Sequence, residues 1–261
     1  MGATATHDPR SILITGASSG LGAALARHYA APGRRLVLGG RHAARLAAVA
    51  AACADRGAAV EHRAGDVTDR AAMRQWIEAA DDAGPLDLVI ANAGVSAGTG
   101  DSGETEEQAR RIFAVNLDGV LNTLHPAKDR MVARGRGQLA IIASLAGYRG
   151  YPGAPAYSAS KAAVKAYGEA LRLDLRPAGV ALSVVCPGFV ATPMTAVNRF
   201  RMPFLMSAER AAAVIARGLA GDRARIAFPW PTAFLSWLSA ALPVALADRI
   251  LSRLPTKGAD G

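Results

Sequence analysis

Short apolar runs rich in branched side chains alternate along the chain with longer segments whose apolar residues recur at helical spacing. The short runs predict buried strands, because a strand covered on both faces carries a nearly continuous apolar stretch. We place strands at residues 11–15, 36–39, 58–63, 86–90, 138–144 and 180–186. We place helices from the turn at 16–22 to about residue 31, at 42–56 and 69–82, over much of 105–134, and at 155–176.

Strands that alternate with helices predict parallel pairing with right-handed crossovers. The expected fold class is therefore α/β, a Rossmann-type doubly wound parallel sheet. No long linker divides the series, so residues 1–261 are interpreted as a single domain, with a core at about 10–228 and an apolar helical extension at about 229–261. Ligands bind such sheets at the carboxyl ends of the strands, and we expect one rim to be lined by the residues that follow those ends: Gly16, Asn92, Ser144, Pro187 and Gly188.

Composition narrows the range of partners. The 261 residues are 51% hydrophobic and carry a formal net charge of +9, which favours anionic partners. The basic residues are scattered without a run of five, so no nucleic-acid partner is expected. Cys53 and Cys186 are far apart, which is typical of a reducing compartment, and the histidines form no cluster that indicates a metal site. Residues 1–10 lack the apolar core of a secretory signal, so a cytoplasmic location is expected.

A glycine-rich turn stands between the first predicted strand and helix. Such a turn presents backbone N–H groups and a helix N-terminus to a phosphate, and its glycines allow a pyrophosphate to approach closely. An ordinary tight turn is the alternative. The candidate phosphate-binding residues are Gly16, Ser18, Ser19, Gly20, Leu21 and Gly22.

Tyr157 and Lys161 are four residues apart in a segment with helical spacing, so their side chains share one helix face. A nearby cation favours the phenolate and lowers the pKa of a tyrosine. Tyr157 is therefore a candidate proton donor or acceptor near neutral pH. Taken alone, this spacing is a weak signal, and an ordinary surface helix is its default interpretation.

These motifs, taken in order, resemble those of the short-chain dehydrogenases/reductases, and the resemblance runs from about residue 10 to 220. The matching residues are the turn Thr15–Gly22, the trio Asn92, Ala93 and Gly94, then Asn116, Ser144, Tyr157, Lys161, Pro187, Gly188 and Thr192. The resemblance implies hydride transfer between a nicotinamide cofactor and an alcohol or carbonyl group.

The same resemblance implies a role for each of four catalytic residues. Tyr157 is the expected acid or base at the substrate oxygen, and Lys161 is expected to lower its pKa and to bind the nicotinamide ribose. Ser144 is expected to hydrogen-bond the carbonyl group, where charge develops during the reaction. Asn116 is expected to hold a water that passes protons to Lys161.

Further cofactor contacts are implied at the residues that match the family on the adenine and nicotinamide sides. Asp66 also fits a second interpretation, that of a helix N-cap. The implied contacts beyond the glycine-rich turn are Arg41, Asp66, Val67, Asn92, Ala93, Gly94, Tyr157, Lys161, Pro187, Gly188, Val190 and Thr192.

The end of the second strand favours NADP(H) over NAD(H). Enzymes that use NAD carry an acid there for the ribose 2′-hydroxyl, but this chain has Gly40 followed by Arg41. A small residue leaves room for a 2′-phosphate, and the guanidinium supplies a cation to pair with it. His42 stands where many NADP-using relatives have a second arginine.

The segment between Gly188 and Ser207 is predicted to be irregular and is rich in Met and Phe. In the family this segment covers the substrate, so we expect an apolar small-molecule alcohol or ketone, because Met adapts to irregular shapes. The alternative is that these side chains only pack the segment itself.

Residues 226–247 carry no charge, and Phe234, Trp237, Leu238 and Leu242 form an apolar helical stripe. The prolines in this stretch argue against a single membrane-spanning helix. Packing beside the substrate pocket or against a second subunit is favoured, and peripheral attachment to a membrane surface stays open. The tail departs from many tetrameric relatives, so the expected assembly is a homodimer, through the helices at about 105–134 and 155–176, or a homotetramer.

Two other functions compete with an enzyme, namely a non-catalytic dinucleotide-binding sensor and a membrane-surface protein. A sensor of this kind usually lacks the tyrosine or the lysine. Both Tyr157 and Lys161 are present, which favours the enzyme.

Overall fold

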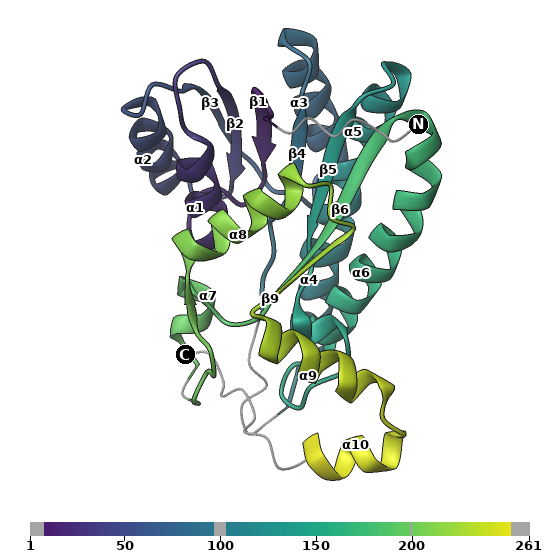
Figure 1. Ribbon diagram of the computed structural model, residues 1–261. Helices are drawn as coiled ribbons and strands as arrows, with labels where there is room; N and C mark the ends of the chain where they lie inside the picture. The colour runs from purple at the N-terminus through teal and green to yellow at the C-terminus, as the bar shows by residue number, and fades with distance from the viewer. Residues whose placement is uncertain (1–7, 97–102, 199, 252–261) are drawn as a thin grey trace.

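A parallel sheet of seven strands, in the order β3-β2-β1-β4-β5-β6-β9, forms the centre of the computed structural model (Figure 1). The model describes residues 8–96, 103–198 and 200–251. Six strands agree with the prediction to within two residues at each end, whereas β9 was not predicted. The strands are β1 Ser11–Ile14, β2 Arg35–Gly40, β3 Ala59–Ala64, β4 Leu88–Ala91, β5 Gly137–Ile142, β6 Val180–Pro187 and β9 Arg225–Phe228.

Helices cover both faces of the sheet, as the doubly wound prediction requires. Alternate residues of each strand point to opposite faces. In β1, Ile12 and Ile14 therefore join the core under α1 Gly20–Tyr29, α2 Ala43–Ala54 and α8 Ala208–Ala220. Leu13 joins the other core, under α3 Arg70–Ala83, α5 Gly119–Ala133 and α6 Pro155–Leu175. The α/β fold class is thus confirmed.

The helix predicted over 105–134 is interrupted. It begins as α4 Glu106–Phe113, where a capping box between Thr105 and Gln108 closes the N-terminus. A π-helical turn at Ala114–Asp118 then precedes α5. Such a turn inserts one extra residue into the helix and is frequent at functional sites. Asn116 lies inside it.

The segment expected to be irregular contains short elements. β7 Val190–Ala191 pairs in parallel with β8 Met206–Ser207, and α7 Pro193–Ala196 lies between them. The rings of Phe189 and Phe200 pack edge to face with centroids 5.9 Å apart. The segment therefore begins after β6, pairs with itself through β7 and β8, and ends at the start of α8.

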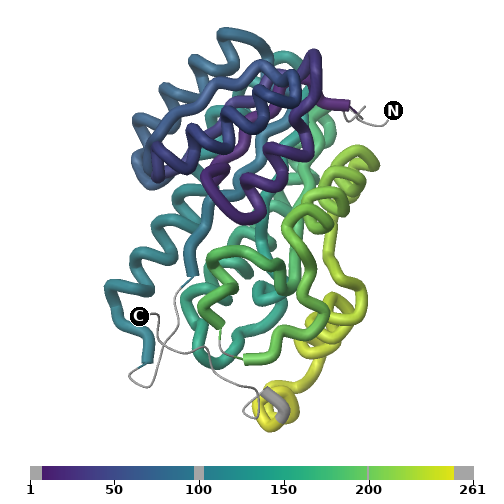
Figure 2. The backbone as a smooth tube through the Cα atoms, turned by 90° about the vertical axis from the view of Figure 1, so that its left-hand side faces the viewer, coloured from purple at the N-terminus to yellow at the C-terminus, as the bar shows by residue number. Residues whose placement is uncertain are grey.

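The chain continues into α9 Trp230–Ala241 and α10 Val244–Leu251, at the end of the molecule where the strands finish (Figures 1 and 2). The prediction that Phe234, Trp237 and Leu238 pack beside the pocket is wrong, because all three are exposed in this chain. Their packing against a second subunit stays a prediction. No helix in the described part of the chain has the length and apolar content needed to cross a bilayer.

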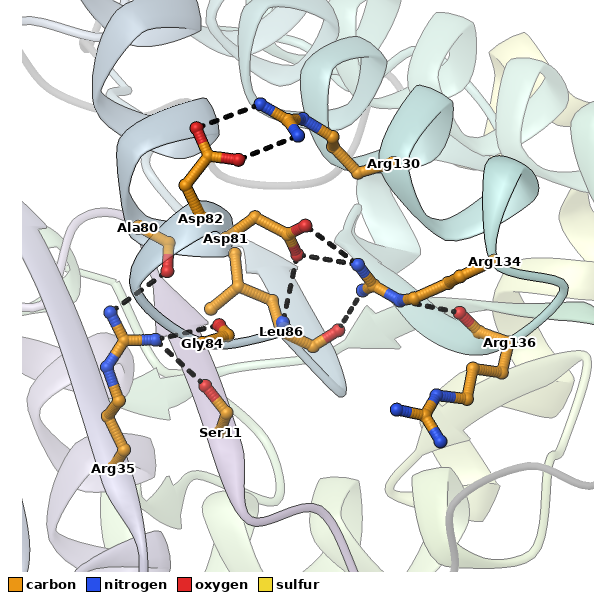
Figure 3. Close-up of polar contacts among 10 residues, drawn as sticks. All are labelled: Ser11, Arg35, Ala80, Asp81, Asp82, Gly84, Leu86, Arg130, Arg134 and Arg136. Carbon is orange, nitrogen blue, oxygen red and sulfur yellow. Dashed lines mark hydrogen bonds and ion pairs between the residues drawn. The ribbon is translucent and has the colours of Figure 1, made fainter.

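A polar network holds the opposite, amino-terminal edge of the sheet (Figure 3). The buried Asp81 accepts two hydrogen bonds of 2.8 Å from Arg134 and one of 2.9 Å from the Leu86 amide. Arg134 also donates to the Leu86 carbonyl, and Arg35 donates to the carbonyls of Ala80 and Gly84. The network fixes the turn between α3 and β4 to the end of α5.

We expect Asp81→Ala to lower the free energy of unfolding by about 3 kcal/mol, because it leaves a half-buried guanidinium without its partner. Urea denaturation followed by circular dichroism measures the loss. The matched control is Asp82→Ala, whose pair with Arg130 is far more exposed and should contribute less than about 1 kcal/mol. Equal losses in the two variants would contradict a special role for the buried pair.

Candidate active site

The glycine-rich turn between β1 and α1 has no room for larger side chains. Gly16 and Gly20 have φ values of 68° and 53°, in the left-handed region that favours glycine. A Cβ on Gly22 would lie 2.3 Å from the Gly16 carbonyl oxygen and 2.5 Å from Nδ2 of Asn92. The first turn of α1 is therefore pressed against the end of β1.

Asn92, at the end of β4, holds this turn in place. Its Nδ2 donates to the carbonyls of Thr15 and Gly16 at 2.9 and 3.3 Å. In return, Oγ1 of Thr15 accepts from the amides of Asn92 and Ala93 at 3.1 and 3.3 Å. The two strand ends that border the site are thus fastened to each other by reciprocal hydrogen bonds.

The N-terminus of α1 is open to an anion. Its N-cap residue, Ser19, makes no side-chain capping hydrogen bond, and the first turn contains no acidic residue. The first N–H groups of a helix have no partner within the helix and carry partial positive charge. They are suited to bind a phosphate group.

A cleft of about 390 Å³ extends from this turn along the carboxyl ends of the strands. Of the residues predicted to form the site, only Asn116 and Asp66 do not line it. The predicted residues in the lining are Gly16, Ser18, Ser19, Gly20, Leu21, Gly22, Arg41, Val67, Asn92, Ala93, Gly94, Ser144, Tyr157, Lys161, Pro187, Gly188, Val190 and Thr192.

Three candidate catalytic side chains meet at one end of the cleft. Tyr157 and Lys161 come from the first turns of α6, which starts at Pro155, and Ser144 follows β5. Ser144 Oγ accepts from the Ala146 amide at 3.1 Å, and a side-chain hydrogen bond links Ser144 to Tyr157. Lys161 Nζ lies 5.8 Å from the centroid of the Tyr157 ring.

Burial dominates the electrostatics of this pair. It raises the pKa of Tyr157, while the hydrogen bond with Ser144 acts in the opposite direction. Burial also lowers the pKa of Lys161 to about 8. The pKa of Tyr157 is thus raised and not lowered as predicted, because the effect of burial outweighs that of the ammonium, which lies 5.8 Å from the ring centroid and donates to the Ile142 carbonyl at 2.9 Å.

Asn116 lies behind the cleft and connects β4 to α6. Its Oδ1 accepts from the Val95 amide at 2.8 Å, and its Nδ2 donates to the Val95 carbonyl at 2.9 Å and to Ser160 Oγ at 3.1 Å. Both hydrogens of the amide are therefore used within the protein. Gly94 lies close by, where a Cβ would come within 3.3 Å of both Asn116 Oδ1 and Lys161 Nζ.

Asp66 has a local hydrogen-bonding role. Its Oδ1 accepts from the amide and the hydroxyl of Thr68, each at 2.9 Å. The alternative prediction of a helix cap is wrong for this residue, because Asp69 caps α3 by accepting from the Ala72 amide.

The end of the cleft beside β2 and α2, where adenosine is expected to bind, is basic. Arg41, His42 and Arg45 line it together with Gly40, and a Cβ on Gly40 would lie 3.1 Å from the Cβ of Ser18. Sequence reasoning missed Arg45, although its position four residues after Arg41 at the start of α2 was a usable signal.

A second group that the sequence did not reveal supports the loop that carries Ser144. Lys165 Nζ and the Arg225 guanidinium lie 5.2 and 5.7 Å from the centroid of the Tyr148 ring. Glu169 pairs with both cations. These contacts fix Tyr148, and with it the short 3₁₀ turn Leu145–Gly147, between α6 and β9.

Comparison with known proteins identifies the family. The model of the family described as short chain dehydrogenase matches residues 10–202. The chain belongs to the short-chain dehydrogenase/reductase family. It is therefore an oxidoreductase with an NAD(P)-binding Rossmann fold.

Its similarity to individual members covers most of the chain. It is 42% identical to an uncharacterized oxidoreductase of Myxococcus xanthus, over 94% of this chain and 97% of the relative. A short-chain dehydrogenase/reductase from Burkholderia phymatum in complex with NAD is 27% identical with a TM-score of 0.81, covering 98% and 99% of the two chains. A short-chain dehydrogenase from Sphingobium yanoikuyae in complex with NADPH is 28% identical with a TM-score of 0.79, covering 96% and 98%.

The buried ammonium predicts a pH dependence of stability. Because the pKa of Lys161 falls to about 8 on folding, the unfolded chain binds more protons at this site between pH 8 and its ordinary value near 10.5. Stability from this group therefore rises with pH across that window. Relative to Lys161→Met, the wild-type protein should gain about 2 kcal/mol in free energy of unfolding between pH 7 and pH 10. If the free energies of unfolding of the two proteins changed with pH in the same way, the ammonium would not be desolvated in the folded state.

Proposed function

We propose that the protein is an NADP(H)-dependent oxidoreductase that interconverts a hydroxyl and a carbonyl group on an apolar small molecule. NADP(H), when bound, supplies or accepts the hydride. The convergence of Ser144, Tyr157 and Lys161 at one end of the cleft, with the glycine-rich turn in the same cleft, is the observation that carries the proposal.

Each of the three side chains has a role that follows from its surroundings. Tyr157 keeps its proton at neutral pH because burial raises its pKa, so it is ready to donate that proton to the oxygen of a carbonyl undergoing reduction. Lys161, still protonated at pH 7, stabilises the negative charge left on the phenol. Ser144 hydrogen-bonds the same substrate oxygen and orients it toward Tyr157.

Preference for NADP(H) rests on the basic end of the cleft. Arg41 and Arg45 supply guanidinium groups that can pair with a 2′-phosphate, and Gly40 leaves the space beside them free of an acid. The N-terminus of α2, which starts at Ala43 without an acidic residue in its first turn, adds partial positive charge.

The lining also supports an uncharged substrate. Among the described residues that line the cleft, the side chains that carry a full charge are Arg41, Arg45 and Lys161. The two arginines lie at the adenosine end, and Lys161 lies behind the Tyr157 ring. Met194, from α7, supplies an apolar wall. An apolar ketone or secondary alcohol fits this arrangement better than a carboxylate.

Replacing the phenol tests the reaction. We expect Tyr157→Phe to lower kcat by about 10²–10⁴-fold, because it removes the proton donor. The affinity for NADPH should stay nearly unchanged. A screen of ketones and secondary alcohols that follows NADPH absorbance measures both proteins side by side.

Tyr167→Phe, on the same helix but outside the cleft lining, is the matched control and should retain wild-type turnover. Turnover that survives in Tyr157→Phe would refute the assigned role. Wild-type protein that binds NADPH but turns over no substrate in the screen would favour a non-catalytic sensor.

Replacing the cleft arginines tests the cofactor preference. We expect Arg41→Ala to raise the Kd for NADPH about tenfold or more, since a charge-assisted bond to the 2′-phosphate is lost. The Kd for NADH should not change, and Arg45→Ala should act in the same direction. Arg56→Ala, just past the other end of α2, serves as the control for charge alone. Tighter binding of NADH than of NADPH to the wild-type protein would overturn the preference.

A further inference from the structure

Helix α9 exposes an unusual amount of apolar surface. The exposed fractions of Trp230, Phe234 and Trp237 are 77%, 53% and 52%. Leu235 and Leu238 are also exposed, and the sequence from 226 to 247 contains no charged residue. Isolated apolar side chains are common on protein surfaces, but a contiguous group of this size marks an interaction site.

The polarity of α9 is inverted relative to that of an ordinary surface helix. A surface helix normally buries its apolar stripe and exposes its polar residues. Here Ser236 is 6% exposed, and its Oγ lies 3.4 Å from the hydroxyl of Tyr151. Arg149 donates to the carbonyls of Ser239 and Leu242 at 3.0 and 3.3 Å. The polar groups of the helix therefore face the protein, and its large apolar side chains face outward.

The body of the protein holds α9 in this orientation. A Cβ on Gly188, which lines the cleft, would lie 3.2 Å from Cδ of Pro229 and 3.3 Å from Oγ1 of Thr232. Ala247 of α10 is buried, and Asp248 pairs with Arg149 at 3.9 Å. Contacts on the inner side of α9 and α10 thus hold the apolar side chains of α9 outward.

Figure 1 shows α7, α9 and α10 at the end of the molecule where the strands finish. More exposed apolar side chains belong to segments at this end. They come from α7 and from the segment before β8. Met194 lines the cleft, so this group borders the cleft directly, whereas Thr232 of α9 lies beside Gly188, which lines it. We call the two groups together the apolar face, formed by Met194, Val197, Phe204, Leu205, Trp230, Phe234, Leu235, Trp237 and Leu238.

We propose that the apolar face binds the surface of an anionic lipid bilayer, with the mouth of the cleft turned toward the lipid. Indole and phenyl rings favour the boundary between headgroups and acyl chains. The net charge of +9 complements an anionic surface. A second copy of the chain seated on this face would cover the mouth through which a substrate must pass, whereas a bilayer can itself hold an apolar substrate.

The binding would be peripheral, in keeping with the lengths of α9 and α10, which lie on the protein as two short helices. The proposal goes beyond the reaction proposed above, and only the choice of a bilayer over a second copy rests on the apolar substrate proposed there. Its test therefore measures lipid binding and not turnover.

The experiment compares flotation of the full chain with vesicles of phosphatidylcholine and phosphatidylglycerol and with vesicles of phosphatidylcholine alone. Wild-type protein should float with the anionic vesicles and more weakly with the neutral ones. Phe234→Ser/Trp237→Ser should weaken binding about tenfold or more, because two large apolar side chains are lost from the contact. Their rings pack on each other with centroids 5.9 Å apart and are half-exposed, so the core stays intact.

Leu173→Ser is the matched control, since Leu173 is an even more exposed apolar residue near the far end of α6. It should float like the wild-type protein. The NADPH affinity of each variant reports on folding. Wild-type protein that stays in the lipid-free fraction, or a double variant that floats as well as wild type, would overturn the proposal. A wild-type dimer that the double substitution converts to monomer, as seen by ultracentrifugation, would assign the face to a protein interface instead.

Fluorescence gives a second measurement that needs no variant. The chain has three tryptophans, of which Trp230 and Trp237 lie on the apolar face and Trp76 packs against the core. Vesicles that contain brominated lipid should quench most of the emission. Emission that is unchanged by such vesicles would exclude insertion of the two indoles into the lipid.

Discussion

The close approach of β1 and β4 at their carboxyl ends is the constraint on which the site depends. These neighbouring strands send their chains to opposite faces of the sheet, α1 to one and the α4–α5 region to the other, so a crevice opens between them. Reciprocal hydrogen bonds between Thr15 and Asn92 hold the floor of this crevice. Because Gly22 has no side chain, the N-terminus of α1 can lie against that floor and present its amides to a phosphate.

A second asparagine, Asn116, connects the segment that follows β4 to the first turn of α6. Asn116 bonds both the amide and the carbonyl of Val95, and through Ser160 it reaches the carbonyl of Tyr157. The chain of contacts runs from the end of β4 to the first turn of α6. The π-helical turn places Asn116 at the start of this chain, and a regular helix would turn its side chain elsewhere. The two asparagines therefore act chiefly by binding backbone groups.

The sequence predicted the parts of the fold that hydrophobic periodicity controls. Six strands and the helices between them were predicted because their apolar runs and turn residues agree with each other. The strand β9 was missed because it has only four residues, the last three of which open the uncharged stretch 226–247. The break at Ala114–Asp118 was missed because a single inserted residue leaves the apolar pattern of the flanking helices almost unchanged. The motif residues that line the cleft were predicted, and Arg45 was missed although it lies close to Arg41 in the sequence. Tyr148, in contrast, depends on contacts with Lys165 and Arg225, which are distant in the sequence.

Burial explains why the electrostatics of the pair could not be predicted from spacing. Spacing alone indicates an ammonium next to a phenol, and that proximity favours the phenolate. The fold buries Lys161 almost completely and Tyr157 in part, which penalises the charged form of each. The pKa of Tyr157 consequently rises while that of Lys161 falls to about 8, so both groups shift toward their neutral forms. A proton then sits on the phenol at neutral pH. In the proposed reaction this proton leaves and charge appears on the phenol, in surroundings that screen it poorly, so the ammonium over the ring is most stabilising at that moment.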